Sequence, residues 1–341
     1  MKKILTLFAF ALSGISVFAQ QDPQFTQYMH NKLFMNPGYA GMKHAFCFTG
    51  IGRQQWAGFD GSPRSGVFSA DIWTPQFGGG IGLNVMYDKL GFENNARYEF
   101  DYSFHLQEVL GGQLGIGIGV GAYSKRVGPG SGEQWQSTTN WTQDPHIPPQ
   151  LKQTVMDFGF GLWYQRGNSW LGLSSTHFNG KNVNAGTTFI GSPPIMHTLL
   201  YQVARHYFIT GGTVFFPGNT WELHPSFLVK TDATITTFDL NATAVFNQRF
   251  WFGVSYRYQD AVCPMIGFQM NGKGAGTHFD VRDEQGGGKG LGSGILKMGF
   301  AYDYTTSGLR SYQSGTFELF VNYCIPVSRG HGESFNDRLF D

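Results

Sequence analysis

Residues 97–107 read RYEFDYSFHLQ, and apolar and polar side chains alternate at every position of this stretch. Tyr98 and Phe100 fall on one face, while Arg97 and Asp101 fall on the other. Successive side chains of a β-strand point to opposite faces, so a strand with this sequence has one apolar and one polar face. Such strands, about ten residues long and separated by turn residues, are typical of transmembrane β-barrels.

The same alternation recurs about fourteen times along the chain, which gives an even number of strands, as a single-chain bacterial barrel requires. We therefore predict an all-β fold, a transmembrane outer-membrane β-barrel of about 14 antiparallel strands that spans residues 44–326. The predicted strands are 44–55, 65–74, 78–88, 95–108, 112–126, 153–165, 169–178, 203–216, 221–230, 234–246, 249–259, 262–271, 293–304 and 316–326.

Residues 1–19 have the features of a cleavable export signal. Lys2 and Lys3 precede an apolar stretch, 4–18, and Ala19 supplies a small residue before the expected cleavage point. The apolar stretch is shorter than the roughly 20 residues that a spanning helix needs. We therefore expect a signal peptide that is cleaved near Ala19, followed by export to the outer membrane.

The segments that flank the predicted barrel are expected to lie on its periplasmic side. Residues 20–43 contain turn-forming residues, and we expect them to form a periplasmic segment. In one interpretation this segment plugs the barrel. Residues 327–341 are polar and are expected to form a periplasmic tail. In this orientation the longest outer connections are 127–152 and 179–202, in keeping with short periplasmic turns. The glycine-rich stretch 272–292 would be a long exception, either a functional excursion or a sign of a mispaired strand.

Composition agrees with a barrel and argues against nucleic acid as a partner. The formal net charge of +1 over 341 residues gives no basic field that would attract nucleic acid. Charged residues make up 14% of the chain, below the quarter that is typical of soluble domains, whereas aromatic residues make up 16%. The mean hydropathy is only −0.21, because inward polar residues offset the outward apolar ones. Membrane lipid is therefore an expected partner, and nucleic acid is not.

No pattern in the sequence indicates catalysis, so we expect no enzyme activity, no cofactor and no metal site. Glu99, Asp101 and His105 share the inward face of one strand, but a polar lumen wall explains them without a metal or acid–base site. The sequence contains neither the G-x-S-x-G nor the H-E-x-x-H signature. Inward glycines are better explained by close approach of a bulky neighbour or a plug than by phosphate binding.

The three cysteines, Cys47, Cys263 and Cys324, all fall on the inward face by parity. Cys47 lies on the first predicted strand and Cys324 on the last, and closure of a barrel makes those two strands neighbours. The sequence allows two alternatives, a disulfide between them or free inward thiols, because it does not give the register of the two strands.

The longest predicted outer loop carries four candidate partner-binding residues: Trp135, Trp141, Pro145 and Pro148. Aromatic rings on a loop stiffened by proline suit contact with another protein. Alternatively, the loop folds back over the mouth of the barrel and packs these rings into a small core of its own.

Several stretches of the mature chain resemble one family. After the signal, residues 21–29 read QDPQFTQYM and residues 36–41 read NPGYAG. Later stretches are RHYF at 205–208, FWFGVSYRYQDAV at 250–262, GFAYDYTTSGLRSYQSGTFEL at 299–319 and NYC at 322–324. Together they resemble the PorP/SprF family, outer-membrane proteins of the type IX secretion and gliding motility systems of Bacteroidetes. The insert at 272–292 and the tail at 327–341 depart from the usual pattern of that family.

The resemblance implies a non-enzymatic barrel that binds and anchors a secreted cell-surface protein. The cargo would be adhesin-like and would carry a C-terminal sorting domain, and the barrel would also contact periplasmic and outer-membrane components of the secretion system. The opening motif adds five candidate partner-binding residues, which would form a fixed periplasmic or plugging element: Gln24, Phe25, Tyr28, Asn36 and Pro37.

The main alternative is a passive porin or uptake channel for small solutes. Fourteen strands leave room for a plugged lumen or a narrow pore. Bulky side chains predicted to face inward, namely Trp163, Trp251 and Phe320, favour a filled lumen.

Overall fold

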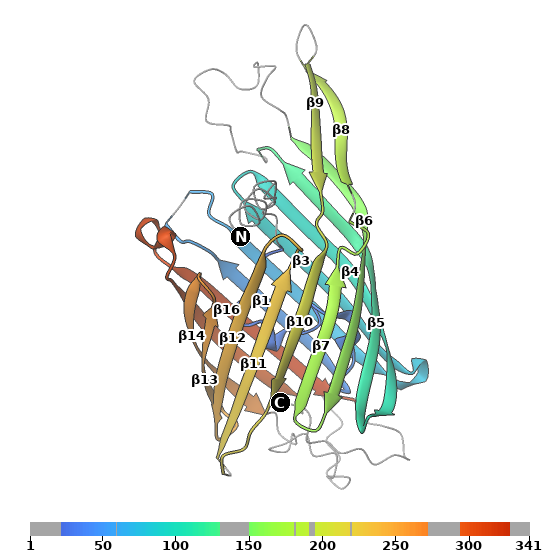
Figure 1. Ribbon diagram of the computed structural model, residues 1–341, viewed down its shortest axis with the longest axis vertical. Helices are drawn as coiled ribbons and strands as arrows, with labels where there is room; N and C mark the ends of the chain where they lie inside the picture. Colours follow the sequence, from blue (N-terminus) through green and yellow to red (C-terminus); the bar gives the residue numbers. More distant parts are fainter. Residues whose placement is uncertain are drawn as a thin grey trace, which may run out of the picture.

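The computed structural model describes residues 22–58, 60–129, 150–180, 182–190, 195–218, 220–271 and 294–327. Within them, fourteen antiparallel strands form one closed barrel, in which each strand pairs with its neighbours along the chain and β1 closes on β16 (Figure 1). Its strands are β1 (Ala45–Gln54), β2 (Arg64–Thr74), β3 (Gly79–Leu90), β4 (Glu93–Val109), β5 (Gly112–Val127), β6 (Leu151–Arg166), β7 (Ser169–Thr176), β10 (His206–Thr213), β11 (Trp221–Thr231), β12 (Thr236–Phe246), β13 (Phe250–Arg257), β14 (Ala261–Asn271), β15 (Ile295–Thr305) and β16 (Thr316–Pro326).

Short helices and one separate hairpin complete the described structure. The helices are 3-10 turns: η1 (Tyr28–His30), η2 (Pro37–Tyr39), η3 (Pro75–Phe77) and η5 (Gly308–Tyr312). Across the described ranges, no helix has the length and apolar character that crossing a bilayer demands. The hairpin is β8 (Asn182–Ile190) with β9 (Ile195–Gln202), which forms a two-stranded sheet outside the barrel.

The predicted strands are confirmed, and each of the fourteen overlaps one strand of the barrel. The β8–β9 hairpin is the difference, because residues 179–202 were expected to be an outer connection without strands. The sequences of its two strands, NVNAGTTFI and IMHTLLYQ, lack the regular alternation that marks a barrel strand. A register irregularity between Ala185 and Thr188 also interrupts the pairing of this hairpin.

The alternation also assigns the two faces of the barrel correctly. Tyr98 and Phe100 are 52% and 53% exposed on the outside, whereas Arg97 and Glu99 are each 1% exposed. Large apolar side chains cover the outside of the other strands in the same way. In water such a surface would aggregate, so the outer face is suited to hydrocarbon.

Two ends of the barrel can be distinguished by their connections. We call the end at which β1, β5 and β7 finish the upper end, and the end with the short turns 110–111 and 167–168 the lower end (Figure 1). Long outer loops and short periplasmic turns are the rule for outer-membrane barrels, so the upper end is expected to face outward. The whole of the 272–292 insert, and all of the 327–341 tail except its first residue, lie outside the described residues.

The wall of the barrel is uneven in height. β4 has 17 residues and β6 has 16, whereas β7 has 8. A strand that crosses the bilayer needs about 9–11 residues. The pairing of β6 with β7 stops at Phe160 and Ser175, and β6 continues above it beside β8. The long strands and the β8–β9 hairpin therefore form a raised wall on one side of the upper end (Figure 1).

A disulfide closes the seam between the first and last strands. Cys47 and Cys324 are directly opposite in the register of β1 with β16, and their Cα atoms are 4.0 Å apart. Of the two possibilities that the sequence left open, the structure has the disulfide. Cys263 is buried on β14 and is a free thiol.

We expect this cross-link to be visible in the unfolded chain. Heat-denatured wild-type protein should run faster on a gel without reductant than with it, because the disulfide joins residues 277 positions apart and keeps the unfolded chain compact. The Cys47→Ser variant should lose this difference and the Cys263→Ser variant should keep it. Identical mobility of the wild-type protein with and without reductant would contradict the cross-link.

Candidate functional site

The lumen of the barrel is occupied along its length by residues 22–43, which we call the plug segment. Asp22, its first described residue, hydrogen-bonds to His177 and His206 at the upper ends of β7 and β10. At the other end, the ammonium of Lys43 lies 4.0 Å from the sulfur of Cys324 at the lower end of β16. The segment thus passes downward through the barrel before β1 turns back upward. It lies inside the barrel and not beneath it.

Buried ion pairs hold the upper part of the plug segment. The guanidinium of Arg53 lies 2.6 Å from a carboxylate oxygen of Asp303 and 2.9 Å from one of Glu318. Glu318 also accepts hydrogen bonds from the backbone N–H groups of Thr26, at 2.8 Å, and Gln27, at 2.7 Å. The Thr26 hydroxyl donates to Asp303 at 2.8 Å. Two carboxylates of the wall are thereby shared between an arginine and the plug segment: Glu318 binds its backbone, and Asp303 binds the Thr26 side chain.

A second pair of charged wall residues contacts the plug segment just above this network. The side-chain amide of Gln24 donates to a carboxylate oxygen of Asp239 at 2.8 Å, and Arg257 binds the other oxygen of Asp239 at 3.0 Å. Arg257 also lies 3.3 Å from Asp303, so the two charged groups form one network. Hydrogen bonds to charged groups are the stronger kind, and this network fixes the register of the plug segment against the wall.

The middle of the plug segment packs through aromatic rings. Phe25 and Phe34 meet edge to face with their centroids 5.6 Å apart, and the ring of His30 stacks on Phe320 at 4.3 Å. Trp251 lies 5.0 Å from His30 on the other side. The ring of His30 is thus held between Phe320 and Trp251 inside the lumen.

The lower part of the plug segment rests on glycines of the wall. The Asn36 side chain donates to the carbonyl oxygens of Leu162, at 3.0 Å, and Leu173, at 3.3 Å. A Cβ atom on Gly117 would lie 2.3 Å from Gly38 N of the plug segment, and one on Gly161 would lie 2.0 Å from the Asn36 side chain. Only glycine lets the backbone of the plug segment touch the wall here, as the inward glycines of the sequence led us to expect.

The last turn of the plug segment is fixed by polar wall residues. His105 contacts the carbonyl oxygen of Ala40 at 2.9 Å through Nε2, and Asp71 accepts the backbone N–H of Gly41 at 3.0 Å. His105, Glu99 and Asp101 are the three inward residues for which a polar lumen wall was expected and a metal or acid–base site was not. Glu99 binds Arg97, and Asp101 accepts a hydrogen bond from Asn84. All three lie in the lumen wall.

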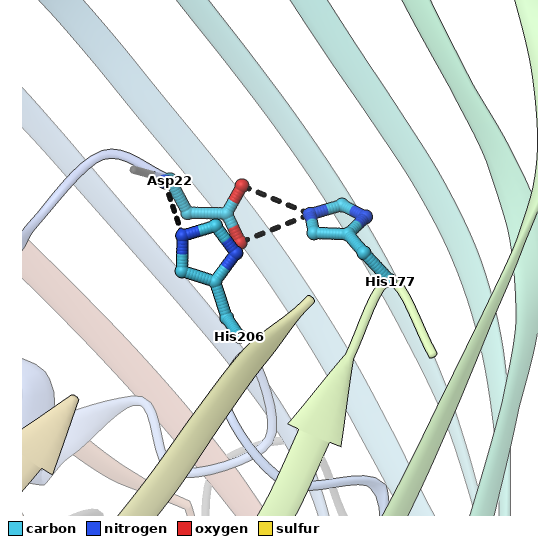
Figure 2. Close-up of side chains that lie close together, drawn as sticks. All are labelled: Asp22, His177 and His206. Atoms are coloured by element: carbon cyan, nitrogen blue, oxygen red, sulfur yellow. Dashed lines mark hydrogen bonds and ion pairs between the residues drawn. The ribbon is translucent and has the colours of Figure 1, made fainter. Parts of the chain in front are cut away.

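At the upper end, Asp22 meets two histidines (Figure 2). The carboxylate oxygens of Asp22 lie 3.0 and 3.1 Å from His177 Nε2. Burial would by itself raise the pKa of Asp22, but the charges of His177 and His206 hold that pKa well below its usual range. Burial would likewise lower the pKa of His177, but the Asp22 and Asp157 carboxylates raise it to about 9.

The structure brings together one group of the candidate residues and leaves the other undescribed. Gln24, Phe25, Tyr28, Asn36 and Pro37 all lie in the plug segment within the lumen, where they contact the wall or other residues of the plug segment. Trp135, Trp141, Pro145 and Pro148 fall outside the described residues. The partner-binding role of both groups stays a prediction.

Sequence reasoning missed the Asp22 cluster because its members are far apart in the chain. The separation between Asp22 and His177 is 155 residues. Both histidines do lie next to the ends of predicted strands, on either side of the 179–202 connection. Placing the plug segment in the lumen is the step that would have brought Asp22 to them.

Comparison with known families decides the identity. The family model of the type IX secretion system membrane protein PorP/SprF matches residues 17–323. The chain belongs to the PorP/SprF family. This PorP/SprF protein is therefore a secretion-related barrel of the outer membrane, as the stretches quoted from its sequence suggested. No curated protein matched its sequence.

Solved structures resemble this PorP/SprF protein only distantly. The CymD monoaromatic hydrocarbon channel has a TM-score of 0.47 and 10% identity, over 89% of this chain and 94% of that one. The toluene transporter TbuX of Ralstonia pickettii has a TM-score of 0.46 and 9% identity, over 87% and 93%. Omp33 of Acinetobacter baumannii has a TM-score of 0.37 and 7% identity, over 83% and 99%.

We expect the Gly117→Ala change to loosen the plug segment of this PorP/SprF protein. The added methyl group would meet the backbone of Pro37 and Gly38, and overpacking of this kind costs about 1–3 kcal/mol. Trypsin should then cleave after Lys32 faster than in the wild-type protein, as followed by mass spectrometry. Gly52→Ala is the matched control, because nothing lies within 4 Å of a Cβ atom there. Equal cleavage rates in both variants would contradict the seating of the plug segment on the glycines.

Proposed function

We propose that this protein is a plugged barrel that binds and anchors a type IX-secreted surface protein at its upper end. The cargo would be adhesin-like and would carry a C-terminal sorting domain, and the barrel would link it to the periplasmic and outer-membrane parts of the secretion machinery. The single observation that carries the proposal is the plug segment, which occupies the lumen through buried ion pairs and backbone contacts. A barrel with its lumen taken up in this way is suited to holding a partner and not to passing solutes.

The raised wall supplies a platform for such a partner. At its base, the Lys125 ammonium of β5 lies 3.8 Å from the centroid of the Tyr201 ring, next to the end of β9. This cation–π contact ties the hairpin to the long barrel strands. Binding residues are commonly placed on loops that a rigid scaffold positions, and β8–β9 extends from such a scaffold. The predicted contact residues of the loop at 127–152 would lie at the same end.

A barrel closed on itself also suits the mechanical task. Every strand is hydrogen-bonded on both sides within the closed sheet, so the barrel offers no free edge from which strands could be pulled. The disulfide between Cys47 and Cys324 adds a covalent link across the seam. An anchor for a surface adhesin has to resist pulling, and this arrangement is suited to it.

We expect replacement of residues 182–202 by a short Gly-Ser linker to reduce the amount of surface protein that the barrel retains. The proteins that co-purify with the tagged barrel from solubilised outer membranes would be identified and quantified by mass spectrometry. Replacement of 272–293, a segment of similar length that follows β14 and precedes β15, by the same linker is the matched control and should leave the co-purifying cargo unchanged. Full retention by the linker variant would remove the hairpin from the binding site.

We also expect the purified protein to give no steady open current in a planar bilayer. The plug segment fills the lumen, so the wild-type conductance should stay at the level of a protein-free bilayer. An open general porin, reconstituted in the same way, is the positive control. A large and steady current from the wild-type barrel would instead favour the porin alternative.

A further inference from the structure

Three side chains from separate parts of the chain converge at the upper end of the lumen. Asp22 comes from the plug segment, His177 follows β7, and His206 begins β10 (Figure 2). One carboxylate oxygen of Asp22 and one ring nitrogen of each histidine lie within 4.8 Å of one another. Two imidazoles and one carboxylate form a donor set that divalent transition metals prefer.

The two histidine rings are oriented by their other nitrogen atoms. His177 Nδ1 lies 2.8 Å from a carboxylate oxygen of Asp157, and His206 Nδ1 lies 3.1 Å from the carbonyl oxygen of Ala204. Both rings therefore direct Nε2 toward Asp22, at 3.0 Å from its carboxylate for His177 and 3.3 Å from its backbone nitrogen for His206. Histidines that bind metals almost always place their second nitrogen against a carboxylate or a backbone carbonyl in this way.

Charged groups surround the cluster. The guanidinium of Arg97 lies 3.8 Å from Asp22 and also pairs with Glu99, and the Lys230 ammonium donates to the carbonyl oxygen of Asp22. The carboxylates of Asp22 and Asp157 both lie against the ring of His177. Imidazoles bind a metal in their neutral form, so a metal ion would take the place of the proton that these two carboxylates favour on His177.

We propose that Asp22, His177 and His206 bind a divalent transition-metal ion, and the donor set favours Zn²⁺. Three protein ligands leave a fourth tetrahedral position for water. Because Asp22 belongs to the plug segment and the histidines to the wall, the ion would join the upper end of the plug segment to β7 and β10. The proposal is independent of which cargo the barrel anchors.

Zinc binding to the purified full mature chain tests the proposal. The protein would be stripped with a chelator in detergent, incubated with zinc chloride, separated from free zinc by gel filtration and analysed for metal by mass spectrometry. We expect about one zinc ion per chain for the wild-type protein, as a three-ligand site requires. His177→Gln and His206→Gln should each lose the bound zinc. His224→Gln should keep it, because His224 lies at the lower end of β11 beside Glu222.

Asp157→Asn tests the orientation of His177 without removing a ligand. We expect this variant to bind zinc about 10–100-fold more weakly than the wild-type protein, since partners of metal-bound histidines usually contribute that much. The heat-modified gel mobility of each variant reports whether its barrel is folded, so a loss of zinc can be separated from a loss of structure. Wild-type protein that elutes without zinc would overturn the proposal. Zinc that stays bound in both His177→Gln and His206→Gln would overturn it too.

Discussion

Charged side chains in the lumen of this barrel are shut away from water, and each of them therefore needs a partner inside the protein. Arg53, Asp303 and Glu318 lie on the wall with side chains at most 2% exposed. An unpaired charge at such a place destabilises a protein by several kcal/mol, typically about 3–5. The wall charges satisfy part of this need among themselves, and the backbone N–H groups of Thr26 and Gln27 satisfy the rest. The wall and the plug segment are accordingly one folding unit.

The inward glycines are the steric counterpart of this electrostatic constraint. In the upper part of the plug segment, polar side chains of the wall bind its backbone. In the lower part, the backbone of the plug segment lies directly against the sheet, and the wall has glycines there. Gly115 and Gly117 alternate with the outward Leu114 and Ile116 of β5. The apolar side chains of this strand therefore face the lipid, whereas its bare backbone faces the plug segment. The family to which the chain belongs is thus represented here by a barrel built around its own N-terminal segment.

Much of the fold could be predicted from the sequence, because its main determinant is local. The two-residue period of segments such as 97–107 is set by lipid on one side of a single strand, so it can be recognised without any knowledge of the neighbours. The β8–β9 hairpin lies outside the barrel and lacks that period. The path of the plug segment depends on contacts such as the one between Gln24 and Asp239, 215 residues apart, and no local pattern encodes them. The Asp22 cluster was missed for the same reason.

The closed wall limits how the plug segment can leave the lumen. A segment inside a closed ring cannot pass sideways through the wall, so it can enter or leave only lengthwise, through one of the two mouths. The pairing of β1 with β16 closes the ring, and the disulfide between Cys47 and Cys324 joins these two strands covalently. Sideways release of the plug segment would therefore require that covalent bond to be broken as well as the hydrogen bonds of the seam.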